Sequence, residues 1–225
     1  MKKEKQAIKK DKIDHENRLK NIYSGRASNY NFIHSLFTFF VDRHWRRITV
    51  KYIEKPVHIV LEIGTGSGLT SAKILNAGKA EGAVGVDLNL KMLEQSRKSK
   101  IKRGVFMPLN ANALELPFKN DSFEVVVTML GIGGVYNVEQ VFREIIRVLK
   151  NNGKIYSIEM CTPQHVFLRF IHKKMIEKLV DLWWGFRDID IESILKKLEI
   201  KDYQLKYRKD ILLGSVYQLA ARIHK

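Results

Sequence analysis

The residues with the clearest capacity for chemistry surround a glycine-rich turn. Glycines stand at positions 64, 66 and 68, and Glu62 precedes the first of them by two residues. A strand that turns sharply into a helix places backbone N–H groups and the positive helix end beside a ligand. Asp87 follows Gly68 by 19 residues, where nucleoside-binding folds carry an acid that accepts hydrogen bonds from ribose hydroxyls. The pattern predicts a site for a nucleoside-containing cofactor.

The glycine spacing favours S-adenosylmethionine over a dinucleotide. The dinucleotide fingerprint G-x-G-x-x-G would need a glycine at position 69, which is Leu69. Glu62 would stand near a pyrophosphate and repel it, whereas its carboxylate suits the ammonium group of S-adenosylmethionine, which carries no phosphate. Gly64 can adopt the dihedrals of the turn, and Gly66 lets a ligand approach the backbone. Gly68 lets the helix pack close to the strand.

Further cofactor candidates follow the predicted strands. Leu88 could cover one face of an adenine or belong to the core. Asn112 could accept a hydrogen bond from the adenine amine or close a turn in the loop 110–113. The residues predicted to bind the cofactor are Tyr30, Glu62, Gly64, Thr65, Gly66, Gly68, Asp87, Leu88, Asn112, Ala113 and Leu130.

The catalytic candidates are fewer, because methyl transfer from a sulfonium is an in-line displacement that mainly needs alignment and exclusion of water. A base is required only where the acceptor must lose a proton. Tyr30 and His34 could supply one, and the alternative is a structural role for both. No metal site is expected: His165 and His172 lack carboxylate support, and the single cysteine, Cys161, excludes a Cys-based zinc site.

The elements that must position these residues alternate along the chain from residue 57. Strands are predicted at 57–63, 83–87, 105–109, 123–128 and 154–159, and helices at 67–77, 89–99 and 139–149, the last closed by Asn151, Asn152 and Gly153. This rhythm predicts an α/β fold with a doubly wound, mostly parallel seven-stranded sheet, Rossmann-like, whose ligand lies at the carboxyl ends of the strands. Segments 200–207 and 213–223 predict an antiparallel C-terminal hairpin.

The regions outside this core are less regular. Residues 1–20 are predicted to be a frayed tail or a solvated helix. Residues 31–47 place apolar side chains at helical spacing, which indicates either a helix packed on the core or an amphipathic lid or membrane-contacting helix. A long helix is predicted over 163–184 and another over 189–198. Trp183, Trp184 and Phe186 could line an acceptor pocket or belong to the core. We therefore divide the chain into a helical extension or lid, 1–50, and one cofactor-binding domain, 51–225.

Composition bounds the partners. The chain of 225 residues has 40 Lys and Arg against 24 Asp and Glu, a net charge of +16. This excess favours an anionic partner such as nucleic acid or a membrane surface, or it reflects a solvated lysine-rich surface. The N-terminus lacks the apolar segment of a signal peptide, and no apolar run approaches the roughly 20 residues of a membrane span. We expect a cytoplasmic protein, with peripheral contact to an anionic membrane as one option.

Residues 60–160 resemble the class I S-adenosylmethionine-dependent methyltransferases. The motifs that carry the resemblance are VLEIGTGSG, AVGVD, NALELPFKNDSFEVVV and FREIIRVLKNNGKI. Closer still, the chain is similar to the ubiquinone/menaquinone biosynthesis C-methyltransferase family over about 20–163, because the segment IYSGRASNYNFIHSLFTFFVDRHWRR follows that family's entry motif. The resemblance implies S-adenosylmethionine as cofactor, S-adenosylhomocysteine as product, and a methyl acceptor of the quinone-precursor type.

The chain also departs from that family's pattern. An Arg-Asn pair, which the resemblance would place after the fourth strand, is replaced by Gly133 and Gly134. The leading hypothesis is a methyltransferase for a hydrophobic small molecule, either a quinone precursor or a lipid-like acceptor. An RNA methyltransferase would use the basic surface, although no RNA-binding module is recognisable. A non-catalytic cofactor-binding protein is the third hypothesis.

Overall fold

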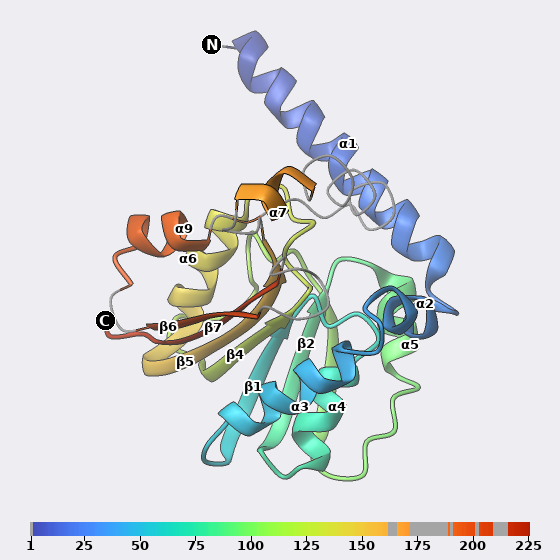
Figure 1. Ribbon diagram of the computed structural model, residues 1–225, viewed down its shortest axis with the longest axis vertical. Coiled ribbons are helices and arrows are strands. Elements are labelled where there is room, and N and C mark those ends of the chain that lie inside the picture. The colour runs from blue at the N-terminus through green and yellow to red at the C-terminus, as the bar shows by residue number, and fades with distance from the viewer. Residues whose placement is uncertain (1, 162–165, 172–188, 190, 201–202, 209–215) are drawn as a thin grey trace.

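The computed structural model describes residues 2–161, 166–171, 189, 191–200, 203–208 and 216–225. Within these residues seven strands form one sheet, with helices on both faces (Figure 1). The strands are β1 (Val57–Ile63), β2 (Ala80–Asp87), β3 (Val105–Asn110), β4 (Phe123–Met129), β5 (Leu149–Met160), β6 (Tyr203–Arg208) and β7 (Val216–Arg222). The helices are α1 (Lys2–Arg26), α2 (Tyr30–Phe37), α3 (Asp42–Tyr52), α4 (Leu69–Asn76), α5 (Leu90–Ser96), α6 (Val138–Val148), α7 (Val166–Ile171) and α9 (Ile191–Lys197).

The strand order is β3-β2-β1-β4-β5-β7-β6, with strands β1 to β5 parallel. From β1 the chain winds outward through β2 and β3, and then returns to place β4 on the other side of β1. The order of the strands therefore reverses between β1 and β4. This is a topological switch point, and open α/β sheets bind their ligands beside the loops at such a point. β7 runs antiparallel to both β5 and β6. These pairings confirm the predicted mostly parallel, doubly wound sheet with antiparallel C-terminal strands.

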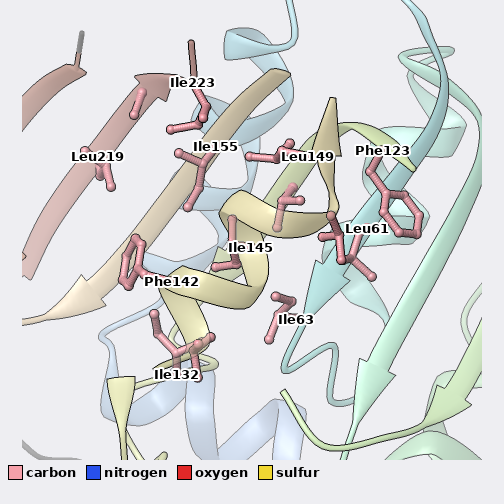
Figure 2. Close-up of a cluster of buried hydrophobic side chains, with 14 of the residues drawn as sticks. Leu61, Ile63, Phe123, Ile132, Phe142, Ile145, Leu149, Ile155, Leu219 and Ile223 are labelled. Atoms are coloured by element: carbon pink, nitrogen blue, oxygen red, sulfur yellow. The ribbon is translucent and has the colours of Figure 1, made fainter. Parts of the chain in front are cut away.

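Both faces of the sheet are buried, which explains the continuous apolar runs in its central strands. On one face, Phe142 and Ile145 of α6 point toward the side chains of β1, β5 and β7, as Figure 2 shows. On the other face, Ile74 and Leu75 of α4 pack with Ile53 against β1 and β4. These two layers hold the carboxyl ends of β1, β2 and β4 in register, where the predicted site residues cluster.

Several predicted boundaries differ from the structure. β2 begins at Ala80 rather than residue 83, α4 begins at Leu69, and α5 ends at Ser96. The largest difference is in β5, which begins at Leu149, so that residues 151–153 lie within the strand instead of closing a helix. Asn152 N donates to Ile223 O (2.8 Å) and Ile223 N donates to Gly153 O (2.9 Å), so the C-terminal segment pairs with this stretch.

The apolar stretch over residues 31–47 forms two helices instead of one. Phe39 and Phe40 take positive φ angles of 50° and 61°, which turn the chain between α2 and α3. Trp45 is buried, with Ile33 packed near it. In contrast, four large apolar side chains on α2 and the turn are exposed: Phe32, Leu36, Phe39 and Phe40. Of the two predicted alternatives, packing of this apolar face on the core is wrong for Phe32, Leu36 and Phe40, which are exposed.

The N-terminal segment forms a helix, as one of the two predicted alternatives has it, and the second half of this helix docks on the domain. α1 runs diagonally across one end of the molecule in Figure 1. His15 is buried, and the amide of Asn89 donates to Lys20 O and to Ser24 Oγ, both at 3.0 Å. The same Asn89 caps α5 as predicted, because its side-chain oxygen accepts from Met92 N. One residue therefore ties α1 to the cap of α5.

The C-terminal third is described only in part. α7 and α9 fall inside the helices predicted at 163–184 and 189–198. Most of the first predicted helix lies outside the described residues. Residues 209–215, between the two described strands of the predicted hairpin, also lie outside them. The same holds for the following side chains that the sequence singled out: His165, His172, Trp183, Trp184 and Phe186.

Candidate cofactor site

The glycine-rich turn after β1 is shaped by contact with the loop after β4. Gly64, Gly66 and Gly68 all have positive φ angles, of 65°, 52° and 73°. A Cβ atom at Gly64 would lie only 2.5 Å from the Cα atom of Gly131. Gly64 is therefore required both by its dihedral and by the close approach of two backbones. At Gly68 a Cβ would lie 3.0 Å from Ser96 Cβ, so this glycine packs against α5.

A large cavity opens at the carboxyl ends of β1, β2 and β4. It contains about 890 Å³ of empty space, its solvent-open mouth included. The predicted cofactor residues that line it are Tyr30, Gly64, Gly66, Asp87, Leu88, Asn112, Ala113 and Leu130. Because these residues come from five separate segments of the chain, the fold gathers most of the sequence-predicted set around one space.

Asp87 is held at the end of β2 by two backbone donors. Its Oδ2 accepts from Gly66 N at 2.8 Å, and its Oδ1 accepts from Asn89 N at 2.9 Å. Burial raises the pKa of Asp87, and these hydrogen bonds oppose the rise. Each oxygen of a carboxylate has further acceptor capacity, so the fixed group can still accept hydrogen bonds from a pair of hydroxyls in the cavity.

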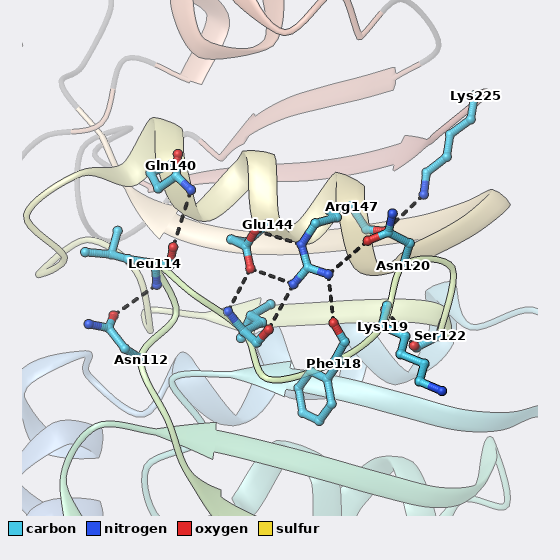
Figure 3. A network of polar contacts seen from close by, with 11 residues as sticks. Asn112, Leu114, Phe118, Lys119, Asn120, Ser122, Gln140, Glu144, Arg147 and Lys225 are labelled. Carbon is cyan, nitrogen blue, oxygen red and sulfur yellow. Dashed lines mark hydrogen bonds and ion pairs between the residues drawn. The ribbon is translucent and has the colours of Figure 1, made fainter.

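The loop that carries Asn112 is fastened to α6 by the polar network in Figure 3. Arg147 donates to the carbonyl oxygens of Leu116 (2.9 Å) and Phe118 (2.7 Å). Glu144 accepts from Leu116 N at 2.7 Å and is ion-paired with Arg147. Within the loop, Asn112 Oδ1 accepts from Leu114 N at 3.0 Å, so Asn112 does close a turn. It also lines the large cavity, so both predicted alternatives remain compatible at this residue.

A small cavity adjoins the large one and is polar. It has about 310 Å³ of empty space, and it shares Tyr30, Gly64 and Gly66 with the large cavity. Glu62 lines it, not the large cavity. The Glu62 carboxylate is buried, where Oε2 accepts from Thr65 Oγ1 (2.8 Å) and Ser71 N (3.0 Å). Burial raises the pKa of Glu62, while hydrogen bonds from Ser71 and Thr65 oppose this.

The small cavity is also lined by a positively charged side chain, Arg46, which the sequence pattern did not single out. Arg46 is 6% exposed and lines the cavity beside Glu62. One of its terminal nitrogens is ion-paired with Asp42, whereas its buried Nε atom has no hydrogen-bond partner within the described residues. A guanidinium and a carboxylate on one cavity match the two charges of an amino-acid group. Arg46 lies in a run of basic residues, and the sequence alone does not show which of them lines the cavity.

The two catalytic candidates lie side by side. The rings of Tyr30 and His34 are stacked, with centroids 5.4 Å apart, and both residues line the small cavity. Burial raises the pKa of Tyr30 above its ordinary range, which favours the protonated phenol as a hydrogen-bond donor. Burial lowers the pKa of His34, and Asp42 opposes this. A catalytic role for either residue stays a prediction.

Helix α1 lines one side of the large cavity, and the sequence did not predict which residues of the N-terminal extension would do so. His15 Nε2 lies 2.7 Å from Gly134 O, and Glu16, Leu19 and Tyr23 line the cavity. At Gly134 the loop after β4 presents only backbone, while Val135 and Tyr136 of the same loop and the side chains from α1 line the cavity beside it. The low apolar content of residues 1–20 gave no helical periodicity from which this contact could be found.

A buried glutamate in β5 holds the loop after β4 in place by accepting hydrogen bonds from it. Glu159, near the end of β5, is fully buried, and its Oε1 accepts from Gly131 N at 3.0 Å and from Thr128 Oγ1. Its other oxygen, Oε2, has no hydrogen-bond partner within the described residues. Burial raises the pKa of Glu159 to about 7, and the hydrogen bonds from Thr128 and Gly131 oppose this.

Replacing Glu159 with glutamine should flatten the pH dependence of stability. Because the pKa of Glu159 is raised from its ordinary 4.5 to about 7 on folding, the folded state binds more protons between these values. The free energy of unfolding therefore falls as pH rises from 4.5 to 7, by roughly 3 kcal/mol at most. Glu159→Gln keeps the Oε1 acceptor but cannot ionise. Urea unfolding at pH 5 and pH 8 measures the difference.

The control for that experiment is Glu115→Gln, which changes an exposed glutamate. This variant should show the same fall in unfolding free energy as the unaltered protein. An equal fall in Glu159→Gln would show that the buried carboxylate is not its source.

Comparison with known sequences identifies relatives over most of the chain. The model of the ubiE/COQ5 methyltransferase family matches residues 10–182. A demethylmenaquinone methyltransferase of Roseiflexus castenholzii is 31% identical over 166 residues, which cover 73% of this chain and 69% of that protein. A ubiquinone/menaquinone biosynthesis C-methyltransferase UbiE of Shewanella sediminis is 29% identical over 177 residues, covering 76% of this chain and 70% of that protein.

Comparison with solved structures identifies the fold. A SAM-dependent methyltransferase of Thermotoga maritima superposes with a TM-score of 0.66 at 19% sequence identity. The match covers 90% of this chain and 98% of that one. At this identity the likeness supports the Rossmann-like methyltransferase fold that the sequence predicted, and the site must be argued from the residues of this chain.

Proposed function

Because this chain belongs to the ubiE/COQ5 methyltransferase family, we propose that it transfers a methyl group from S-adenosylmethionine to an apolar small molecule of the quinone-precursor type. The family makes it an S-adenosylmethionine-dependent methyltransferase. The acceptor is the proposed part. It is supported by relatives named for ubiquinone and menaquinone biosynthesis, and by the lining of the large cavity, where Glu16, Lys20 and Asp87 are the only charged side chains among the described residues.

The single observation that carries the cofactor assignment is the pair of joined cavities. Asp87 stands in the large cavity, Glu62 and Arg46 stand in the small one, and Tyr30 lines both. We assign the nucleoside end of the cofactor to the large cavity, where the fixed Asp87 carboxylate suits the ribose hydroxyls. Its amino-acid end is assigned to the small cavity, where Glu62 suits the ammonium and Arg46 suits the carboxylate. When bound, S-adenosylmethionine supplies an electrophilic methyl group on its sulfonium.

The other predicted cofactor residues have narrower parts in this proposal. Leu88, Ala113 and Leu130 offer apolar contact in the large cavity, and Thr65 orients the Glu62 carboxylate through its hydroxyl. Gly68 lines neither cavity and would act by letting α4 pack close to its neighbours.

The N-terminal segment is proposed to be a helical lid. We divide the chain into this extension, residues 1–50, and the cofactor-binding domain, residues 51–225. In support, α1 and α2 contribute Tyr23 and Tyr30 to the wall of the large cavity. Closing the cavity would exclude water from the reacting methyl group, which in-line transfer requires.

A cytoplasmic location with peripheral contact to an anionic membrane completes the proposal. None of the helices in the described ranges combines the length and apolar content that a bilayer span requires. A second candidate, methylation of RNA, is favoured only by the net charge of +16.

The proposal is tested by incubating the protein with methyl-labelled S-adenosylmethionine and separate lipid, RNA and protein fractions of the source cell. We expect label in the lipid fraction, and none from an Asp87→Ala variant. Label confined to RNA would support the second candidate and overturn the first. If calorimetry shows cofactor binding but no fraction is labelled, a non-catalytic cofactor-binding protein becomes the better account.

A further inference from the structure

The turn between α2 and α3 exposes more apolar surface than the fold explains. Phe32 is 67% exposed and Phe39 is 65% exposed, with Leu36 and Phe40 also exposed. These four side chains lie within nine residues: Phe32 and Leu36 are on α2, whose other side packs on the core, and Phe39 and Phe40 are in the turn that follows. Large apolar patches of this kind on a soluble protein mark interaction sites.

The conformation of the turn is what holds the two phenylalanines outward. Phe39 and Phe40 adopt positive φ angles of 50° and 61°, in a region that non-glycine residues rarely occupy. The turn is fixed by Phe40 N, which donates to Ser35 O at 2.6 Å, and by Thr38 N, which donates to His34 O at 2.9 Å. Because this backbone conformation costs free energy, we expect the exposed phenylalanine side chains to gain compensating contacts with a binding partner.

A basic groove adjoins this patch. Phe32 and Phe40 stand on its rim, and its cationic lining residues are Arg43, Arg46, Lys73, Lys98 and Lys100. The only acidic lining residue among the described ones is Asp42, which is buried and ion-paired with Arg46. The other four cations therefore have no carboxylate in the groove. Burial and the nearby arginines, Arg46 first, lower the pKa of Lys73, as expected where like charges crowd together.

Apolar side chains beside uncompensated cations match the surface of an anionic bilayer. Aromatic and aliphatic side chains enter the headgroup–acyl boundary, while lysine and arginine stay with the phosphates. Arg43 already lies over the Phe40 ring, with Cζ 5.2 Å from the centroid, so charge and ring are presented together. We propose that the α2–α3 turn and its basic groove dock this protein on an anionic phospholipid bilayer.

This inference rests on the proposed function in one respect, because an apolar acceptor of the quinone type would be dissolved in that bilayer. The groove also shares Arg46 and Leu69 with the small cavity, so the docking surface adjoins the cofactor site. Docking would bring the methyl donor to the membrane that holds the acceptor. Vesicle binding needs neither cofactor nor acceptor, so failure of docking can be told apart from failure of methyl transfer.

The test is co-sedimentation of the full chain with vesicles of phosphatidylcholine alone or with 30% phosphatidylglycerol added. We expect binding to the anionic vesicles only. Lys98→Ala/Lys100→Ala should lower the partition coefficient about thirtyfold, since each basic residue near such a surface contributes about 1 kcal/mol. Phe39→Ser/Phe40→Ser should lower it at least tenfold, and the binding that remains should keep its sensitivity to added salt, because this variant retains all the cations of the groove.

Two matched variants control for charge and for exposed apolar area. Lys55→Ala/Lys150→Ala removes two exposed lysines, which lie at the amino-terminal ends of β1 and β5. Val105→Ser removes an apolar side chain that is 61% exposed. Both should bind vesicles like the unaltered protein. The proposal is overturned if the protein does not bind anionic vesicles. It is also overturned if Phe39→Ser/Phe40→Ser and Lys98→Ala/Lys100→Ala bind as well as the controls. Binding of RNA in place of vesicles, lost with Lys98→Ala/Lys100→Ala, would also overturn it.

Discussion

Replacing Gly64 with alanine should destabilise the fold by at least about 2 kcal/mol and eliminate binding of S-adenosylmethionine. The backbone at residue 64 has a φ of 65°, which costs an L-residue about 1–2 kcal/mol. In addition, the new Cβ would lie 2.5 Å from Gly131 Cα and 2.6 Å from Gly131 O. Because those atoms belong to backbone and not to a flexible side chain, the loops after β1 and β4 must separate, and both line the cofactor cavity. Urea unfolding and calorimetry measure the two effects.

The matched control is Gly82→Ala, in the middle of β2. A Cβ atom there would meet no atom closer than 3.8 Å. This substitution should leave cofactor affinity unchanged and alter stability by no more than about 1 kcal/mol. If Gly64→Ala behaves like Gly82→Ala, the close approach of the two loops does not govern the site.

Removing the Arg46 guanidinium should weaken binding of S-adenosylmethionine about a hundredfold while sparing ligands without a carboxylate. A hydrogen-bonded ion pair in a buried site contributes roughly 1.5–3 kcal/mol. Arg46→Met alone would leave Asp42 as an unpaired buried charge, which is strongly destabilising. The variant to examine is therefore Arg46→Met/Asp42→Asn, which removes both members of the pair. Isothermal calorimetry measures the affinity.

The decisive comparison uses decarboxylated S-adenosylmethionine, which keeps the ammonium and the nucleoside. The unaltered protein should bind it about a hundredfold more weakly than the full cofactor, and the double variant should bind both equally. Arg43→Met changes an exposed arginine on the same helix and should not disturb either affinity. Equal loss of both ligands in the double variant would mean that Arg46 supports the fold and does not bind the carboxylate.

The sheet could be predicted because its strands are buried on both faces. β4 is mostly apolar, with Val125, Val126 and Val127 at its centre, and the glycine turn after β1 marks the passage from strand to helix. The same pattern brought most of the predicted cofactor residues to one cavity. Boundaries were less predictable: Asn151 to Gly153 have the composition of a turn, yet they lie in β5 because the C-terminal segment pairs with them.

The sequence predicted a helical N-terminal extension but not how its helices are divided. Two consecutive phenylalanines with positive φ break the predicted helix, and no propensity rule anticipates that conformation. A membrane-contacting helix over 31–47 was one of the two predicted alternatives, whereas the position of Arg46 in the small cavity was not predicted. α1 has few apolar residues, and its position depends on single contacts such as His15 with Gly134.

The central claim is methyl transfer from S-adenosylmethionine to an apolar acceptor of the quinone-precursor type, and one measurement tests it most directly. The protein is supplied with methyl-labelled S-adenosylmethionine and a demethylated isoprenoid quinone in anionic vesicles, and the extracted quinone is analysed by mass spectrometry. We predict a quinone heavier by one labelled methyl group with the unaltered protein, and no such product with Asp87→Ala. An unlabelled quinone, from protein that calorimetry shows to bind the cofactor, would contradict the account.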